Sequence, residues 1–321
     1  MTGALEALDR WLQAPAPAER LALLRIAIGG FVTVWLIASV GEVDRLADRS
    51  AAEFDPIGVL SPLDAPLAAG ALWLGWIALV FLGIAFTVGI GFRIVGPLFG
   101  LGVLAWSTYH SSWGRLLHFE HLFTIHVLLL GLAPSADALA VRRIGTSDTA
   151  PPDDDVRYGW PVRLMAIATV TSYALSGLAK LRFTGTAWFG PDVLADHIAY
   201  SATRIETVGG PTPPLAAFVL ANAWLIPPMA VAALAIELGA PLALIDRRLR
   251  KVWAVGAIGF HAMTGLTMWV FFGYRGLGFG LLPLFAVEDW RRAAAVRLSR
   301  GNPLRSASSH TADRGRLRPG A

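Results

Sequence analysis

Apolar residues in this chain are gathered in long runs that short polar segments separate. Several runs reach the roughly 20 residues that a helix needs to cross the hydrocarbon core of a bilayer. Because a helix satisfies its own backbone hydrogen bonds in lipid, each run predicts a transmembrane helix. We therefore expect an all-α fold, a polytopic bundle of about eight spans. The predicted spans are 21–41, 67–90, 94–110, 118–137, 161–182, 215–240, 252–272 and 276–289.

Two of the runs depart from a regular span. The run 215–240 contains Pro227 and Pro228, and Pro241 follows it, so we expect a kink or break there, because proline removes a helix hydrogen bond. The run 276–289 is the shortest. The predicted organisation is an interfacial N-terminal segment (1–20), a transmembrane domain (21–290) and a disordered basic tail (291–321).

The composition agrees with a membrane protein. Of the 321 residues, 55% are hydrophobic and 16% are charged, against about 25% charged in typical soluble proteins. The sequence contains no cysteine. Disulfides, thiolate catalysis and iron–sulfur clusters held by this chain are therefore excluded.

The basic residues predict the orientation of the bundle. With the N-terminus inside, seven of the 27 basic residues fall on the outer side, which leaves 20 on the inner side. This asymmetry follows the positive-inside rule and accounts for the net charge of +4 without a nucleic-acid partner. We therefore expect a multi-pass protein of a bacterial cytoplasmic membrane, with both termini inside and the lipid bilayer as its partner.

Lys180 is the most informative charged residue, because ionisable groups inside a membrane are costly and often functional. It lies near the outer end of the predicted span 161–182. Helical steps of three and four residues place it on one face with Gly177, Ser176 and Tyr173. We expect this face to meet the bundle interior, with Gly177 allowing close approach of another helix or a ligand. Burial favours the neutral amine, which suits a general base; a lysine that extends to the lipid headgroups is the alternative.

A second polar cluster opens the predicted span 118–137. His118 and His121 are three residues apart and share a helical face, and Glu120 lies between them. Two histidines and a carboxylate could hold a metal ion. No complete ligand motif such as HExxH is present. We therefore expect no metal site, but a hydrogen-bonded cluster that is either structural or in contact with an anionic ligand.

Two more polar residues lie within predicted spans. His261 sits about eleven residues from the outer end of its span, close to the bilayer midplane. Glu237 lies toward the inner side, so we do not expect it to reach Lys180. The sequence predicts an outer-leaflet pocket between the fourth, fifth and seventh spans, lined by Lys180, Tyr173, His121 and His261.

These residues also carry a family resemblance. A histidine opens a span after a short outer loop (His121), an ELGxPL run contains Glu237, and His261 lies in the middle of a span before the last ones. A Y-x-x-x-G-x-x-K-L run that a Trp and a Gly follow is the closest match. Over about residues 20–290, the chain resembles the vitamin K-dependent γ-glutamyl carboxylase-like membrane domain. This domain is also called the horizontally transferred transmembrane (HTTM) domain. The matching residues of that run are Tyr173, Gly177, Lys180, Leu181, Trp188 and Gly190.

The resemblance implies a catalytic role for Lys180 and His121. In the carboxylases, the lysine that matches Lys180 deprotonates vitamin K hydroquinone, and oxygenation of the quinol yields a strong base. That base removes a glutamate γ-proton, and the carbanion takes up carbon dioxide; the histidine that matches His121 assists. The implied cofactor is a vitamin K-type quinol. We also expect Gly177, Trp188, His118 and Glu120 to belong to the predicted pocket. Animal carboxylases have a further lysine where this chain has Ala179, and they continue into a large soluble domain that this sequence lacks.

Three functions are compatible with the sequence. The first is a quinol-dependent carboxylase or oxidoreductase that works at the outer leaflet. The second is a non-enzymatic scaffold or maturation factor, whose polar pocket binds a small secreted peptide or a lipid-like molecule. The third is a small-solute transporter, because a broken helix such as the one near Pro227 can line a substrate path.

Overall fold

The computed structural model describes residues 2–114, 118–141 and 154–300. In this part of the chain the regular secondary structure is helical, apart from one isolated β-bridge between Ala16 and Asp155. The expected all-α fold is thus confirmed.

The chain forms two compact units, Met1–Phe285 and Ala286–Ala321. The helices of the first unit are α1 (Thr2–Leu12), α2 (Ala18–Ala38), α3 (Gly41–Ala47), α4 (Ala69–Val88), α5 (Phe92–Ser111), α6 (His118–Leu132), α7 (Val156–Thr184), α8 (Asp192–Thr207), α9 (Ala216–Ala221), α10 (Ile226–Gly239), α11 (Arg247–Met268) and α12 (Gly273–Gly276), with 3-10 turns η1 (Ala51–Glu53), η2 (Gly58–Leu60), η3 (Gly185–Phe189), η4 (Ala223–Leu225), η5 (Ala240–Leu244) and η6 (Phe279–Leu284).

Within the described part of the chain, four helical segments are long and apolar enough to cross a membrane. They are Ala18–Ala38, Ala69–Val88, Val156–Phe189, which joins α7 to η3, and Ala223–Leu244, which joins η4, α10 and η5. Their outward faces carry large apolar side chains: Leu74 is 70% exposed and Phe81 is 67% exposed. A water-soluble protein rarely leaves so much apolar surface uncovered.

Two predicted spans differ from the observed helices. The break near Pro227 is confirmed, since α9 ends at Ala221 and α10 restarts at Ile226, with Pro227 in its first turn. Residues 276–289 are not one helix: α12 ends at Gly276, η6 follows, and the backbone is extended at Phe285. Gly278, with φ +84°, and Pro283 lie within this stretch and prevent a continuous helix.

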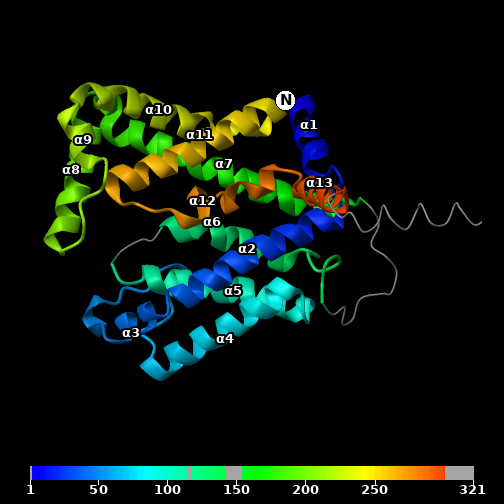
Figure 1. Cartoon of the computed structure of the whole chain (residues 1–321). Helices are drawn as coiled ribbons and strands as arrows, with labels where there is room; N and C mark the ends of the chain where they lie inside the picture. Colours follow the sequence, from blue (N-terminus) through cyan, green and yellow to red (C-terminus); the bar gives the residue numbers. More distant parts are fainter. Residues whose placement is uncertain (1, 115–117, 142–153, 301–321) are drawn as a thin grey trace, which may run out of the picture. The chain divides into compact units, whose positions relative to one another are not determined.

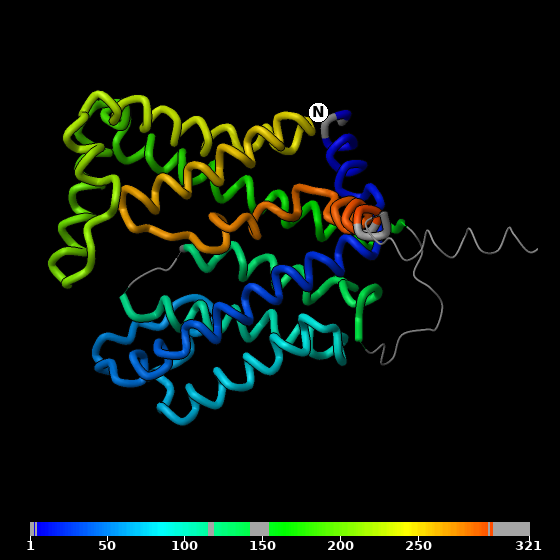
Figure 2. The backbone as a smooth tube through the Cα atoms, in the orientation of Figure 1, coloured from blue at the N-terminus to red at the C-terminus, as the bar shows by residue number. Residues whose placement is uncertain are grey.

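The helices of the first unit pack as two connected groups (Figures 1 and 2). Helices α2, α4, α5 and α6 contact one another, and α7 contacts α10 and η5, which in turn contact α11. Contacts of α6 with both α2 and α7 join the groups. Small residues set the closest approach, because a Cβ atom on Gly131 of α6 would clash with the backbone of Gly96 in α5.

Helices α3, α8 and α9 lie at one end of the first unit, and α1 lies at the other (Figure 1). Helix α8 was not expected from the sequence, which we interpreted there as an outer loop. Its buried residues Leu194, Ile198 and Ala202 recur at every fourth position and face the core formed with α9 and α10. This helix and η3 cover the end of α7 and α10, where the site described below is found.

The second unit is described through helix α13 (Val287–Arg300). We expected the tail 291–321 to be disordered, but residues 291–300 are the last turns of this helix, so that boundary was wrong. A good helix-forming composition, with Ala293, Ala294 and Arg297 in this stretch, explains the difference. The rest of the predicted tail, 301–321, lies outside the described residues.

Candidate functional site

A cavity of about 690 Å³ lies between α7, α8, α10, α11 and the segment that follows α11. Its volume falls within the range of roughly 300–1,000 Å³ that is typical of small-molecule sites. Most of its wall is apolar, and its polar side chains come from six elements: α7, η3, α8, α10, α11 and α12. The polar lining residues are Tyr173, Ser176, Lys180, Thr184, Trp188, His197, Tyr200, Ser201, Arg204, Glu237, His261, Thr264 and Arg275.

The closest polar contact of the cavity joins Lys180 to Glu237. The Lys180 Nζ atom lies 2.5 Å from Glu237 Oε1 and donates a hydrogen bond to it. The side chains are 26% and 4% exposed. This ion pair connects α7 to α10, and the second carboxylate oxygen, Oε2, is buried without a hydrogen-bond partner in the described part of the chain.

Our expectation that Glu237 lies away from Lys180 was therefore wrong. The indole of Trp188, just after α7, donates to Ala230 O on α10 (3.0 Å), and this contact aligns the two helices. Lys180 precedes Trp188 by eight residues, and Glu237 follows Ala230 by seven residues. Because the helices are antiparallel, the two charged residues meet. The start of α10 extends beyond the end of α7. The sequence prediction assumed that both helices end at the same membrane surface, and it therefore placed Glu237 too far from Lys180.

Gly177 permits this contact between α7 and α10. A Cβ atom at Gly177 would lie 3.0 Å from Leu238 Cγ and 3.1 Å from Glu237 Cβ. Both distances are tighter than ordinary van der Waals contacts, so only glycine fits without a shift of the Leu238 side chain or of α10. The close approach of another helix at Gly177, expected from the sequence, is confirmed.

Tyr173 and His261 form a second buried polar pair in the cavity wall. The Tyr173 hydroxyl and His261 Nε2 share a hydrogen bond of 2.7 Å between α7 and α11. His261 Nδ1 is buried and has no hydrogen-bond partner among the described residues. The Arg275 guanidinium lies 5.5 Å from the centre of the Tyr173 ring, so a third polar group borders this pair.

Trp188 covers the Lys180 ammonium. The distance from Lys180 Nζ to the Trp188 ring centre is 5.4 Å, within the range of a cation–π interaction. Trp188 is buried, and its indole is fixed by the bond to Ala230 O. Lys180 is therefore held between an aromatic face and a carboxylate, rather than extended toward headgroups.

His121 does not reach the cavity, so the predicted lining was wrong for this residue. On α6 the positions Glu120, Thr124 and Val127 are buried, whereas His121 and Ile125 are exposed. His121 follows Glu120 by one residue, about 100° around the helix, and so faces outward. The structure describes His118 only as the first residue of α6.

Glu120 belongs to a separate cluster at the end of α5 and the start of α6. Its Oε1 lies 2.9 Å from His110 Nδ1, and His110 Nε2 lies 3.8 Å from Glu42. Glu120 does not line the cavity. In the described ranges 2–114, 118–141 and 154–300 there is no group of three or more histidine, aspartate or glutamate side chains that could hold a metal ion.

Sequence reasoning missed several residues of the cavity. His197, Ser201 and Arg204 come from α8, and their spacing of three and four residues was the available signal. Arg275 lies in the short helix α12, between two of the predicted spans, and no local pattern marks it.

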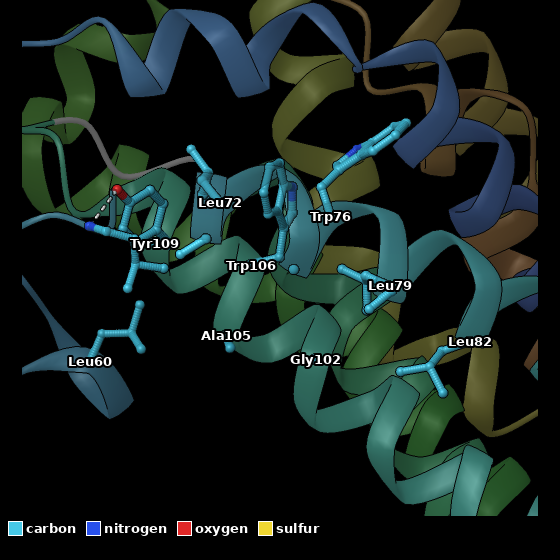
Figure 3. A pocket seen from close by; sticks show the side chains of 13 residues that line it. Leu60, Leu72, Trp76, Leu79, Leu82, Gly102, Ala105, Trp106 and Tyr109 are labelled. Atoms are coloured by element: carbon cyan, nitrogen blue, oxygen red, sulfur yellow. Dashed lines mark hydrogen bonds between the residues drawn. The ribbon is translucent and has the colours of Figure 1, made fainter. Parts of the chain in front are cut away.

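A second cavity, of about 230 Å³, is apolar and lies between α4 and α5 (Figure 3). Trp76, Leu79 and Trp106 border it, and the Tyr109 hydroxyl at one end accepts a bond from Leu67 N (3.3 Å). It contains no charged side chain. This cavity can therefore hold apolar groups but offers no acid–base chemistry.

Comparison with known proteins adds no relative. No family model, no curated protein and no solved structure matches this chain.

Proposed function

We propose that this chain is an integral membrane protein of the vitamin K-dependent γ-carboxylase-like (HTTM) kind. The four long apolar helices and their exposed apolar side chains support a membrane location. We propose that α5, α6 and α11 also cross. We propose that the segment from α12 to η6 is the eighth crossing, and that packing against protein compensates its irregular backbone: Tyr274, Gly280 and Leu281 are buried. Irregular backbone is tolerated at membrane depth only in such surroundings.

The distribution of basic residues supports an orientation with both termini inside, in a bacterial cytoplasmic membrane. In that orientation the cavity around Lys180 opens toward the outer leaflet. Helix α1, with Leu5 and Leu8 exposed, then lies at the inner interface.

The proposed activity is proton transfer on a lipid-soluble ligand, of which a quinol is the example that the resemblance implies. The observation that carries the proposal is the Lys180–Glu237 pair in the wall of a mostly apolar cavity of small-molecule size. An apolar cavity with a few convergent polar groups suits a molecule that dissolves in the membrane.

The pair can act as an acid–base couple. In the charged form Lys180 is an ammonium and has no lone pair, so it is not yet a base. Transfer of its proton to Glu237 gives an amine and a carboxylic acid, and a water-poor cavity favours this neutral form over separated charges. The amine then takes the proton of a ligand hydroxyl, which leaves a ligand oxyanion beside the ammonium. Glu237 keeps the first proton until that proton is released to water.

This proposal requires a lysine at position 180. Lys180→Arg keeps the positive charge, but a guanidinium does not give up its proton, so the neutral couple cannot form. The test is oxygen uptake by the purified protein in nanodiscs with reduced 2-methyl-1,4-naphthoquinone, because the anion of a naphthoquinol reacts with oxygen faster than the neutral quinol. We expect uptake with the wild type, and background rates with Lys180→Arg and Glu237→Gln. Wild-type uptake at the background rate contradicts the proposal.

The pair also favours a second candidate, a non-enzymatic scaffold or maturation factor that binds a small peptide or lipid-like molecule. The observation that supports this candidate is that Glu237 neutralises the charge of Lys180, and that the ion pair joins α7 to α10 as a structural ion pair does. In that case Lys180→Arg should retain the biological activity of the protein, whereas Lys180→Ala should lose it. The enzymatic proposal expects both variants to be inactive.

A further inference from the structure

Arg275 is a buried cation that forms no ion pair and no side-chain hydrogen bond with the described residues. The residue is 9% exposed and lines the cavity. Its Nε atom is buried and has no hydrogen-bond partner among the described residues. The one carboxylate in the cavity wall, that of Glu237, is bonded to Lys180.

Such a guanidinium is costly unless something neutralises it, because burial removes water that would solvate the charge. The rings of Tyr173 and Phe272 lie 5.5 Å and 6.0 Å from the Arg275 guanidinium carbon and supply part of the compensation through their π faces. They do not supply hydrogen-bond acceptors. The guanidinium therefore retains unused donors at the edge of the cavity.

The charges of the cavity wall add to this argument. Three cations line it, namely Lys180, Arg204 and Arg275, against one carboxylate, so the formal excess is two positive charges. Arg204 is exposed on α8, and water can solvate it. Arg275 is the buried part of the excess. Arginine in such a setting matches planar anions, which it binds with two parallel hydrogen bonds.

We propose that the cavity takes an amphipathic anion, a lipid-like molecule whose carboxylate or phosphate is bound by Arg275. Its apolar part would lie along Phe260, Met268 and Phe272, which line the same cavity. This inference rests on the proposed function, in that the cavity receives a lipid-soluble molecule. It goes further, because a quinol is neutral before it loses a proton, whereas Arg275 recognises a group that is already negative.

Binding of three single-chain probes tests the proposal. Dodecyl phosphate, dodecanoate and dodecanol have the same chain and differ in the charge of the head group. Dissociation constants are measured by calorimetry on the protein in nanodiscs of neutral phosphatidylcholine. The wild type should bind one or both anions at least about tenfold more tightly than dodecanol, because hydrogen bonds between charged groups are stronger than those of a neutral hydroxyl. Equal affinities for the three probes would overturn the proposal.

Variants assign the preference to Arg275. Arg275→Gln should lose the preference for the anions and keep the affinity for dodecanol, whereas Arg275→Lys should retain part of the preference. The matched control is Arg182→Gln, which removes an exposed arginine of α7 that does not line the cavity. An undiminished preference in Arg275→Gln overturns the proposal. If Arg275→Gln does not fold, the test relies on Arg275→Lys. If Arg275→Lys binds the anions as tightly as the wild type does, the proposed contact with a planar guanidinium is contradicted.

Two further results separate this inference from the proposed function. Inorganic phosphate alone should bind at least about tenfold more weakly than dodecyl phosphate, because it lacks the apolar contacts; equal binding overturns the amphipathic ligand. If the wild type binds none of the probes and no quinol, the proposed function fails. If it binds dodecanol or a quinol but shows no preference for anions, the inference about Arg275 fails alone.

Discussion

The Lys180 ammonium and the Glu237 carboxylate meet at 2.5 Å between α7 and α10, under the indole of Trp188. This contact makes Lys180 one half of a pair whose other half comes from a distant part of the chain. The pair has a structural role between two helices and the role proposed above in proton transfer, and the two roles can be measured separately.

The first prediction is an energetic coupling between Lys180 and Glu237. Lys180→Met and Glu237→Gln should each destabilise the protein, because each leaves a charge or polar group without its partner. The double variant should lose less than the sum of the single losses, with a coupling of about 0.5–3 kcal/mol. The lower part of this range is expected, since Lys180 is 26% exposed and water screens its charge. The free energy of unfolding of the four proteins is measured in a detergent mixture of increasing denaturing strength. If the losses of the two single variants add up to that of the double variant, the pair contributes nothing to stability.

The second prediction concerns the close contact at Gly177. Gly177→Ala should push α10 away and lower stability by about 1–3 kcal/mol, as overpacking does. Gly239→Ala is the matched control, since it lies on α10 and a Cβ atom there meets nothing within 4 Å. Alanine improves helix propensity at both positions, so the difference between the two variants reports the steric contact. Equal melting temperatures would contradict the packing described here.

The third prediction concerns Asp246, which caps the start of α11 outside the long apolar helices. Its carboxylate accepts hydrogen bonds from Leu249 N (3.1 Å) and Arg248 N (2.7 Å), and these bonds lower its pKa below the usual value of 3.8. Because the pKa is lower in the folded protein than in the unfolded chain, the stabilisation is complete above about pH 4 and is lost as the pH falls through the folded-state pKa.

The loss should be visible in the melting temperature. Asp246→Ala should melt lower than the wild type at pH 7, and the difference should shrink as the pH falls below about 4. Asp246→Asn keeps a capping oxygen that does not titrate, so its melting temperature should lack this pH-dependent component. A difference between wild type and Asp246→Ala that is independent of pH would show that the cap is not charged.

The fourth prediction concerns orientation. The chain has no cysteine, so single cysteines can be introduced at exposed sites without background. Arg204→Cys on α8 should react with a membrane-impermeant thiol reagent in intact cells, and Leu249→Cys on α11 should react only after the membrane is opened. The reverse pattern would place the cavity on the inner side.

The sequence predicted the helical class and most helix positions, because long apolar runs leave few alternatives in a membrane. It also predicted that Lys180, Tyr173 and Trp188 belong together, since all three lie within one stretch of the chain. The residues that contact them from other segments of the chain were harder to predict. Glu237 was misplaced because the register of α10 against α7, seen in the Trp188–Ala230 hydrogen bond, does not follow from the lengths of the apolar runs. His121 was misplaced because a single helical step decides whether a residue faces inward.

Arg275 was beyond sequence reasoning for a different reason. It lies in α12, a helix of only four residues between α11 and η6, which is too short for a periodic pattern to tell which way its side chain points. Its position depends on the packing of α7 and α11 around Tyr173 and His261.

The central claim is that the cavity beside Lys180 receives a lipid-soluble ligand. Ala233 lines this cavity from α10, and its neighbour Ala232 is exposed on the same helix. Ala233→Trp therefore fills the cavity, whereas Ala232→Trp adds the same side chain outside it. The most direct measurement is the binding of reduced 2-methyl-1,4-naphthoquinone to the purified protein in nanodiscs. The account predicts binding by the wild type and Ala232→Trp, and a loss of at least about tenfold in affinity in Ala233→Trp. Equal affinity in all three proteins would contradict it.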